Sequence, residues 1–152
     1  MDATALLKAD HAKLKALFNE ANELSDRAYA ARARLFQQIE RELKLHTQIE
    51  EQIFYPALKA KTKAATPERD EVLEAYEEHA GAKELLRRIE ATDPKDETYK
   101  AKVQVLSEMV IHHAQEEESE MFKQARKLLS KGELEELGDE IAAMKKKATA
   151  RV

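Results

Sequence analysis

The amino-acid sequence predicts an all-α protein, an antiparallel up-down four-helix bundle with one additional C-terminal helix. Helix-forming residues dominate the composition, with 37% charged residues and only three glycines and three prolines in 152 residues. Apolar residues recur at helical spacing through four long segments and a shorter fifth one, and no segment shows the alternation typical of a strand. Short loops between long helices imply antiparallel neighbours.

The first two helices are predicted over residues 4–24 and 30–61, and each carries one apolar face along its length. The residues of these faces are Leu7, Leu14, Phe18 and Ala21 in the first helix, and Leu35, Ile39, Leu43, Ile53, Phe54 and Ala57 in the second. Proline lacks an N–H group and its ring clashes with the preceding turn, so Pro56 is expected to kink the second helix near its end.

The third and fourth helices are predicted over residues 67–91 and 94–129, each with proline as its first residue. Thr66 and Asp93 are the expected N-caps, and proline is well tolerated after a cap because its missing N–H has no partner there. The inner face of the fourth helix is formed by Val103, Leu106, Val110 and Met121.

The chain is expected to break at Ser130 or Gly132, and an amphipathic fifth helix follows over 133–147. Its apolar residues are Leu134, Leu137, Ile141 and Met144. Residues 1–129 are therefore predicted to form the bundle, and residues 130–152 a C-terminal amphipathic helix packed on its outside.

Four of the five histidines fall on these apolar faces, one on each long helix. The four are His11, His46, His79 and His113. On the second helix, Glu50 lies four residues after His46 and shares its face; on the fourth, Glu117 stands in the same relation to its histidine. The histidines are 35 residues apart in the first half and 34 apart in the second, and Glu50 and Glu117 are 67 apart, as are His46 and His113. Packing two such hairpins together would bring four imidazoles and two carboxylates to one level of the core.

A metal would make these buried carboxylates tolerable. Buried carboxylates are unfavourable unless paired, two at one depth repel each other, and no lysine or arginine occupies the neighbouring inward positions. Without cysteine, the donors are imidazole and carboxylate, which suit iron, zinc or manganese. Six donors are few for two octahedral ions, so a position for an exogenous ligand should stay open. His112 lies about 100° around the helix from His113 and is expected to be a surface residue or to support a ligand.

At these residues the chain resembles the hemerythrin-like family of HHE cation-binding domains, over residues 4–129. The stretches that carry the resemblance are Asp10-His11, residues 46–58, Glu78-His79 and residues 112–126. The resemblance implies two non-haem iron ions bridged by two carboxylates and a solvent-derived oxygen (oxo or hydroxo). By position, Glu50 and Glu117 would be the bridges, His11 and His46 would bind one iron, and His79 and His113 the other.

Two departures from the oxygen-carrying members set the expected function apart from reversible oxygen storage. Ala75 stands where those proteins have a fifth histidine ligand, and His113 and Glu117 are separated by four residues rather than five. Tyr55 and Tyr76 are either replacements for the lost ligand, pocket residues or core aromatics.

Several functional classes are disfavoured by the sequence. The net charge is −4 without a long basic block, which argues against nucleic acid as a partner. No apolar run approaches 18 residues and the start lacks a signal-like pattern, so no membrane association and a cytoplasmic location are expected. The Glu-x-x-His pairs of ferritin-like bundles, the His-Glu-x-x-His motif of zinc hydrolases and glycine-rich phosphate loops are all missing.

The expected function is that of a non-haem di-iron protein that binds or reacts with small oxidants such as dioxygen, peroxide or nitric oxide, as in oxidative stress. The alternatives are a catalase-like enzyme that decomposes peroxide, and a metal-free helical adaptor. Whether the chain is an enzyme, and whether it self-associates, is left open by the sequence.

Overall fold

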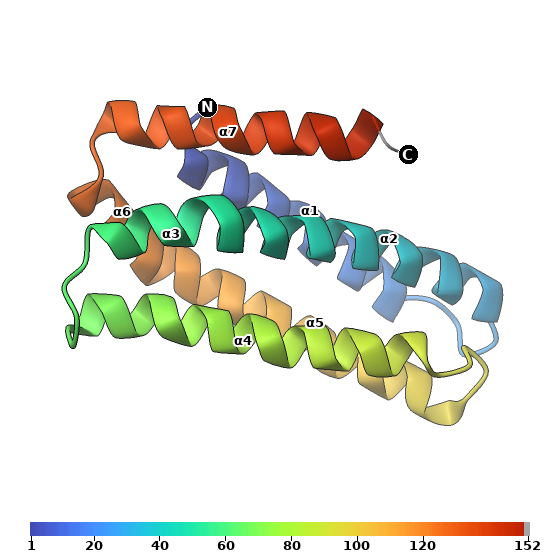
Figure 1. Ribbon diagram of the computed structural model, residues 1–152. Coiled ribbons are helices and arrows are strands. Elements are labelled where there is room, and N and C mark those ends of the chain that lie inside the picture. The colour runs from blue at the N-terminus through green and yellow to red at the C-terminus, as the bar shows by residue number, and fades with distance from the viewer. Residues whose placement is uncertain (151–152) are drawn as a thin grey trace.

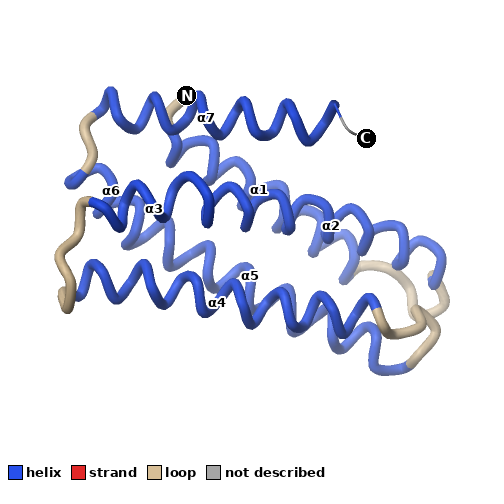
Figure 2. The backbone as a smooth tube through the Cα atoms, viewed as in Figure 1, coloured by secondary structure: helices blue, strands red, loops and turns tan. Residues whose placement is uncertain are grey.

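Helices and short loops account for residues 1–150, the part of the chain that the computed structural model describes, and no strand occurs among them (Figure 2). The elements are α1 (Ala3–Asn22), α2 (Tyr29–Ile49), η1 (Glu50–Phe54), α3 (Tyr55–Ala60), α4 (Pro67–Glu90), α5 (Glu97–Glu116), η2 (Glu117–Met121), α6 (Phe122–Leu128) and α7 (Lys131–Ala150). The runs α2-η1-α3 and α5-η2-α6 are each one continuous rod, so four rods form an antiparallel bundle (Figure 1). The predicted fold class is confirmed. None of the described helices is long and apolar enough to cross a membrane.

The two proline-containing helix starts differ from each other. At α4 the prediction is confirmed, because the Thr66 hydroxyl accepts the N–H of Arg69 at 3.3 Å and Pro67 is the first helical residue. The prediction for the fourth helix is wrong by three residues. Asp93 is not its cap; α5 begins at Glu97.

The residues before α5 form a turn of their own. The N–H of Asp96 donates to the Asp93 carbonyl at 2.8 Å, which puts Pro94 at the second position of a β-turn, where its fixed φ is equally favoured. Asp96 then caps α5 by accepting the N–H of Thr98 at 2.8 Å.

A π-helical turn interrupts both of the rods that carry the glutamates. The turns η1 and η2 begin at Glu50 and Glu117, and their last hydrogen bonds run from Tyr55 N–H to Glu50 and from Phe122 N–H to Glu117. Such turns insert an extra residue and are frequent at functional sites. Because of that insertion, the side chain five residues after each glutamate returns to the face of the glutamate.

Pro56 does not cause the π-turn by itself, since η2 has no proline. It is the second residue of α3, where it has no N–H to offer the Glu51 carbonyl. The Tyr76 hydroxyl donates to that carbonyl instead, at 3.4 Å. In this rod the helix type changes at Glu50, six residues before Pro56, the site of the expected kink.

Two apolar clusters fill the bundle, one at each end. One is built around Leu7, Phe54 and Ile141, and the other around Phe18 and Leu106. Along α1, His11 lies between Leu7 of the first cluster and Leu14 of the second. The level of the histidines therefore separates the two halves of the core.

Helix α7 covers the outside of the bundle alongside α1 (Figure 1). It buries Leu134, Gly138 and Ile141. Ser130 and Glu133 start it with reciprocal bonds, each N–H donating to the side chain of the other at 3.0 Å. Residues 151 and 152 of the segment predicted at the C-terminus lie outside the described residues.

Candidate metal centre

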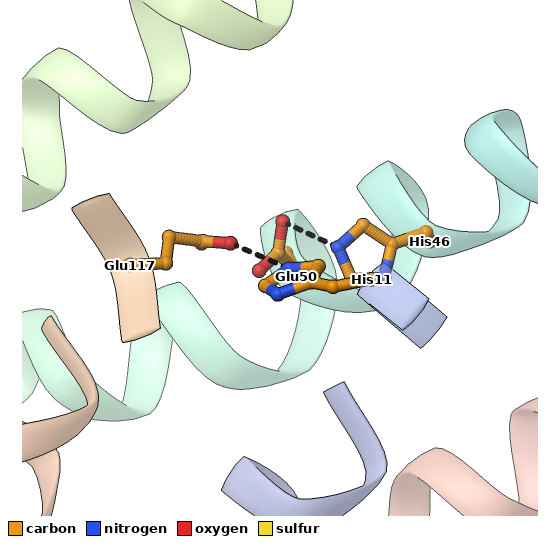
Figure 3. A group of neighbouring side chains, drawn as sticks. All are labelled: His11, His46, Glu50 and Glu117. Carbon is orange, nitrogen blue, oxygen red and sulfur yellow. Dashed lines mark ion pairs between the residues drawn. The ribbon is translucent and has the colours of Figure 1, made fainter. Parts of the chain in front are cut away.

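The six side chains proposed from the sequence as metal ligands lie together at the middle of the bundle. Their donor atoms form two groups that share Glu50, within each of which the atoms lie within 4.8 Å of one another. The groups are His11, His46, Glu50 and Glu117, and Glu50, His79 and His113. Figure 3 shows the side chains of the first group pointing toward one another. Five of the six are buried, and the side chain of His113 is 12% exposed.

In the first group, the inner nitrogens of both histidines approach carboxylate oxygens without forming hydrogen bonds, whereas in the second group His79 Nε2 is hydrogen-bonded to Glu50 Oε1 at 3.1 Å. Nε2 of His11 lies 3.0 Å from Oε1 of Glu117, and Nε2 of His46 lies 3.2 Å from Oε1 of Glu50. Buried donor atoms without a hydrogen-bond partner in the described protein include His11 Nε2, His46 Nε2, Glu50 Oε2 and Glu117 Oε1. Two donors at right angles, each about 2.1 Å from one ion, are about 3.0 Å apart. The residues present therefore fit bound metal ions.

A second carboxylate lies opposite the outer nitrogen of every one of these histidines. The Nδ1 distances are 2.8 Å from His11 to Glu118, 3.0 Å from His46 to Asp10, 2.9 Å from His79 to Glu51 and 3.2 Å from His113 to Glu78. In each pair the carboxylate comes from a different rod than the histidine. The four pairs therefore link the four rods in a closed ring. The pairs of His11, His46 and His79 are hydrogen bonds, which fix the tautomer and orientation of ligating imidazoles, whereas His113 Nδ1 only lies near the Glu78 carboxylate.

The sequence reasoning missed these four carboxylates as parts of the site. A signal was present, because each is adjacent in sequence to a proposed ligand. Asp10 and Glu78 directly precede a histidine, and Glu51 and Glu118 directly follow a glutamate. Each one supports the histidine of a neighbouring rod rather than its own neighbour in the chain.

The buried charges perturb one another strongly. Burial disfavours the charged form of His46, but the attraction of Glu50 and the bond to Asp10 outweigh it and raise the pKa of His46 to about 10. For His113 burial is likewise outweighed by Glu117, which raises its pKa to about 9. Burial would raise the pKa of Glu50, but the neighbouring imidazoles hold it well below its usual value. Without metal, protons on His46 and His113 thus offset part of the carboxylate charge.

Tyr55 adds a hydroxyl group to the donor group that contains His79 and His113. Its oxygen lies 3.2 Å from Nε2 of His79 and 3.1 Å from Nε2 of His113. Its single proton can be donated either to Glu50, at 3.1 Å, or to Glu117. Of the roles left open for this residue, these contacts favour a replacement ligand or a pocket residue over a core aromatic alone.

The position equivalent to Tyr55, five residues after Glu117, is Phe122. The donor group of His11 and His46 therefore has a phenyl ring beside it, where the group of His79 and His113 has a hydroxyl group. Phe122 stacks on His11, with ring centroids 5.8 Å apart and planes 4° from parallel. Tyr76 packs edge-on against the Tyr55 ring, and its hydroxyl donates to a backbone carbonyl rather than into the centre. Ala75 is buried and supplies no donor.

The fifth histidine lies outside the centre. The His112 side chain is 68% exposed, and its Nε2 lies 3.0 Å from Glu116. Helix α7, in contrast, reaches toward the centre, because the Lys145 ammonium donates to Asp10, the partner of His46.

Comparisons with known proteins point to the same kind of site. Residues 2–125 match the family model of the hemerythrin HHE cation-binding domain. The chain is 30% identical over its whole length to a DNA nickase of Nostoc sp., of which it spans only 41%. It is 31% identical over 144 residues to an uncharacterized protein of Mycobacterium tuberculosis, covering 94% of this chain and 84% of that one.

A solved structure resembles the whole fold. It is the crystal structure of a hemerythrin HHE cation-binding domain-containing protein from Mycobacterium kansasii, a homologue of Rv2633c. The TM-score is 0.83 at 28% sequence identity, and the match covers 99% of this chain and 89% of the other. The chain belongs to the hemerythrin HHE cation-binding domain family, and its buried histidines and glutamates form a candidate metal site of that family.

Proposed function

We propose that this protein binds two non-haem iron ions between its four rods and reacts there with small oxidants such as dioxygen, peroxide or nitric oxide. The observation that carries the proposal is a set of buried inner donor atoms that lack a hydrogen-bond partner among the described residues, while each outer histidine nitrogen lies within 3.2 Å of a carboxylate. The unpaired inner atoms are His11 Nε2, His46 Nε2, Glu50 Oε2 and Glu117 Oε1. A histidine that served only to pack the core would need no such arrangement on both sides of its ring.

Each of the two donor groups would hold one ion. His11 and His46 would hold one ion, and His79 and His113 the other, with Tyr55 beside it. Glu50 belongs to both donor groups and Glu117 lies near His11 and His113, so these two carboxylates would be shared by the ions. Bound iron would supply the one-electron oxidation and reduction that the side chains of the centre do not provide.

The protein's own groups would bind and orient the ions and hold a proton ready. The two buried carboxylates would offset the charge of the cations, and the outer carboxylates would keep the imidazoles in place. Burial, together with Glu50 and Glu117, raises the pKa of Tyr55 well above its ordinary value. In the metal-free protein the Tyr55 hydroxyl therefore keeps its proton and donates it toward the carboxylates.

Elemental analysis of protein purified without added metal tests the proposal, and about two irons per chain are expected. Glu50→Ala and Glu117→Ala should each lose at least one iron, whereas Glu116→Ala, which removes an exposed neighbour outside the centre, should retain both. Retention of two irons in both of the first variants would reject the bridging role. Absence of any transition metal from the folded protein would favour the metal-free adaptor.

Peroxide separates binding from catalysis. Steady release of oxygen from excess peroxide would indicate a catalase-like enzyme, whereas one stoichiometric oxidation would indicate binding or sensing. The activity named for the Nostoc relative belongs to a protein of which this chain spans 41%, and the net charge of −4 does not favour contact with phosphate backbone.

A further inference from the structure

A hollow of about 400 Å³ lies inside the bundle beside the imidazoles. All four histidines of the centre line it. Its other walls come from the same four helices and are mainly apolar, with Leu14, Leu43, Ala82, Met109 and Val110 among them. The polar lining is therefore concentrated at the imidazoles and at the rim.

The rim lies between α4 and α5. The exposed residues among the lining are Glu77 and Gly81 on α4 and His112 on α5, so the hollow opens to solvent there. Gly81 faces Met109 closely, because a Cβ atom at position 81 would lie 3.3 Å from Cε of Met109. Methionine has a flexible, unbranched side chain, so Met109 can change its rotamer to admit an occupant.

The volume exceeds what a small oxidant needs. A water molecule takes up about 30 Å³ of liquid, and a diatomic or peroxide molecule is only modestly larger. An apolar cavity of about 150 Å³ binds benzene, and sites for small organic molecules are typically about 300–1,000 Å³. The hollow falls in the range of organic ligands.

We propose that this hollow binds an apolar organic molecule about the size of a substituted benzene, with one small hydroxyl-type group directed at the imidazoles. The apolar walls stabilise the body of such a molecule by removing it from water. At the histidine end, His11 Nε2 and His46 Nε2 have no hydrogen-bond partner among the described residues and can bond to the hydroxyl group. Bound metal would occupy the same inner nitrogens, so this binding mode belongs to the metal-free protein.

The test uses 2-phenylpropan-2-ol, titrated into the metal-free protein by isothermal calorimetry. Saturable binding of one molecule per chain is expected. Ala82→Leu places extra carbons in the hollow, where they take up volume that the ligand needs, and should weaken binding by about tenfold or more. Ala80→Leu is the matched control: it adds the same atoms two residues away, at an exposed position outside the lining, and should bind as wild type.

Val110→Phe fills the hollow from α5 and gives an independent second variant if Ala82→Leu folds poorly. Loss of binding in a folded filling variant, with binding kept in the control, supports the site. Absence of saturable binding to wild type, or equal affinity in a folded filling variant, overturns it. Neither outcome of the calorimetry depends on how much iron the protein binds, so a failure of ligand binding can be distinguished from a failure of the proposed function.

Discussion

His46 on α2 donates from Nδ1 to Oδ2 of Asp10 on α1 at 3.0 Å, and the opposite nitrogen of the same ring faces Glu50 at 3.2 Å. The imidazole is thus held between two carboxylates from two rods. Asp10 is held in turn by Lys145 of α7, a helix beyond the stretch that matches the family. Lys145, Asp10 and His46 therefore form a chain of contacts from α7 through α1 to α2.

Asp10→Asn should weaken metal binding without preventing folding. The amide keeps the size of the carboxylate but loses its charge, and loss of such supporting partners typically lowers metal affinity about 10–100-fold. Competition with a chromophoric chelator measures the affinity. Asp139→Asn, at an exposed position on α7, is the matched control and should leave it unchanged. Unaltered affinity in the Asp10 variant would show that Asp10 does not support the metal.

Tyr55→Phe should loosen one ion more than the other. The hydroxyl reaches His79 and His113 but has no contact with the other two histidines of the centre, so the ion beside it should be lost first on dialysis against chelator. Tyr76→Phe removes a hydroxyl that reaches only a backbone carbonyl, and it should retain both ions. Equal iron contents in the two variants would rule out a contribution of Tyr55 to holding metal.

The metal-free protein should become less stable as the pH rises. The pKa of His46 is raised to about 10 and that of His113 to about 9, above the ordinary value of 6.5. Their protonated forms therefore favour the folded state fully below about pH 6.5, and this contribution is lost as the pH rises toward 9–10. Glu50 has the opposite effect at low pH. Because its pKa is depressed in the folded protein, its contribution to stability is present above its unfolded pKa near 4.5 and is lost on acidification.

Urea midpoints of the metal-free protein at pH 6.5 and 9.5 measure this effect. The midpoint should fall between these values, and it should fall less in a variant that carries both His46→Gln and His113→Gln. A pH dependence identical in the two proteins would show that these imidazoles are not charged in the folded protein.

The sequence was sufficient to find the six central side chains, because helical periodicity places each on an inward face and the repeat of 67 residues aligns the glutamates. It was insufficient for the outer carboxylates. Whether Glu118 faces His11 depends on how far two rods are rotated toward each other, and that rotation is set by packing rather than by local spacing.

The π-turns explain why Tyr55 could not be placed from periodicity. At 100° per residue, a side chain five residues after Glu50 points away from it, whereas the inserted residue of η1 returns Tyr55 to the same face. The start of α5 also could not be placed from local spacing, because it depends on a turn before the helix. Asp93 and Asp96 are both good caps, and the turn around Pro94 decides in favour of the second.

Gly138→Ala should destabilise the packing of α7, although alanine is the better helix former. A Cβ atom at this position would lie 2.2 Å from the Met1 carbonyl oxygen and 3.1 Å from the backbone of Asp2, so α7 or the N-terminal segment must move. Overpacking of this kind typically costs about 1–3 kcal/mol, more than the gain of up to about 1 kcal/mol from helix propensity.

Gly132→Ala on the same helix is the control. Its Cβ would meet only Ser130 Oγ, at an ordinary 3.9 Å, so propensity alone acts there and the variant should be as stable as wild type or more stable. Thermal unfolding followed by circular dichroism compares the two variants. If Gly138→Ala melts at or above the temperature of Gly132→Ala, the close approach of α7 to the N-terminal residues does not limit stability. A lower melting temperature together with weaker iron binding would tie the seating of α7 to the Lys145–Asp10–His46 contacts.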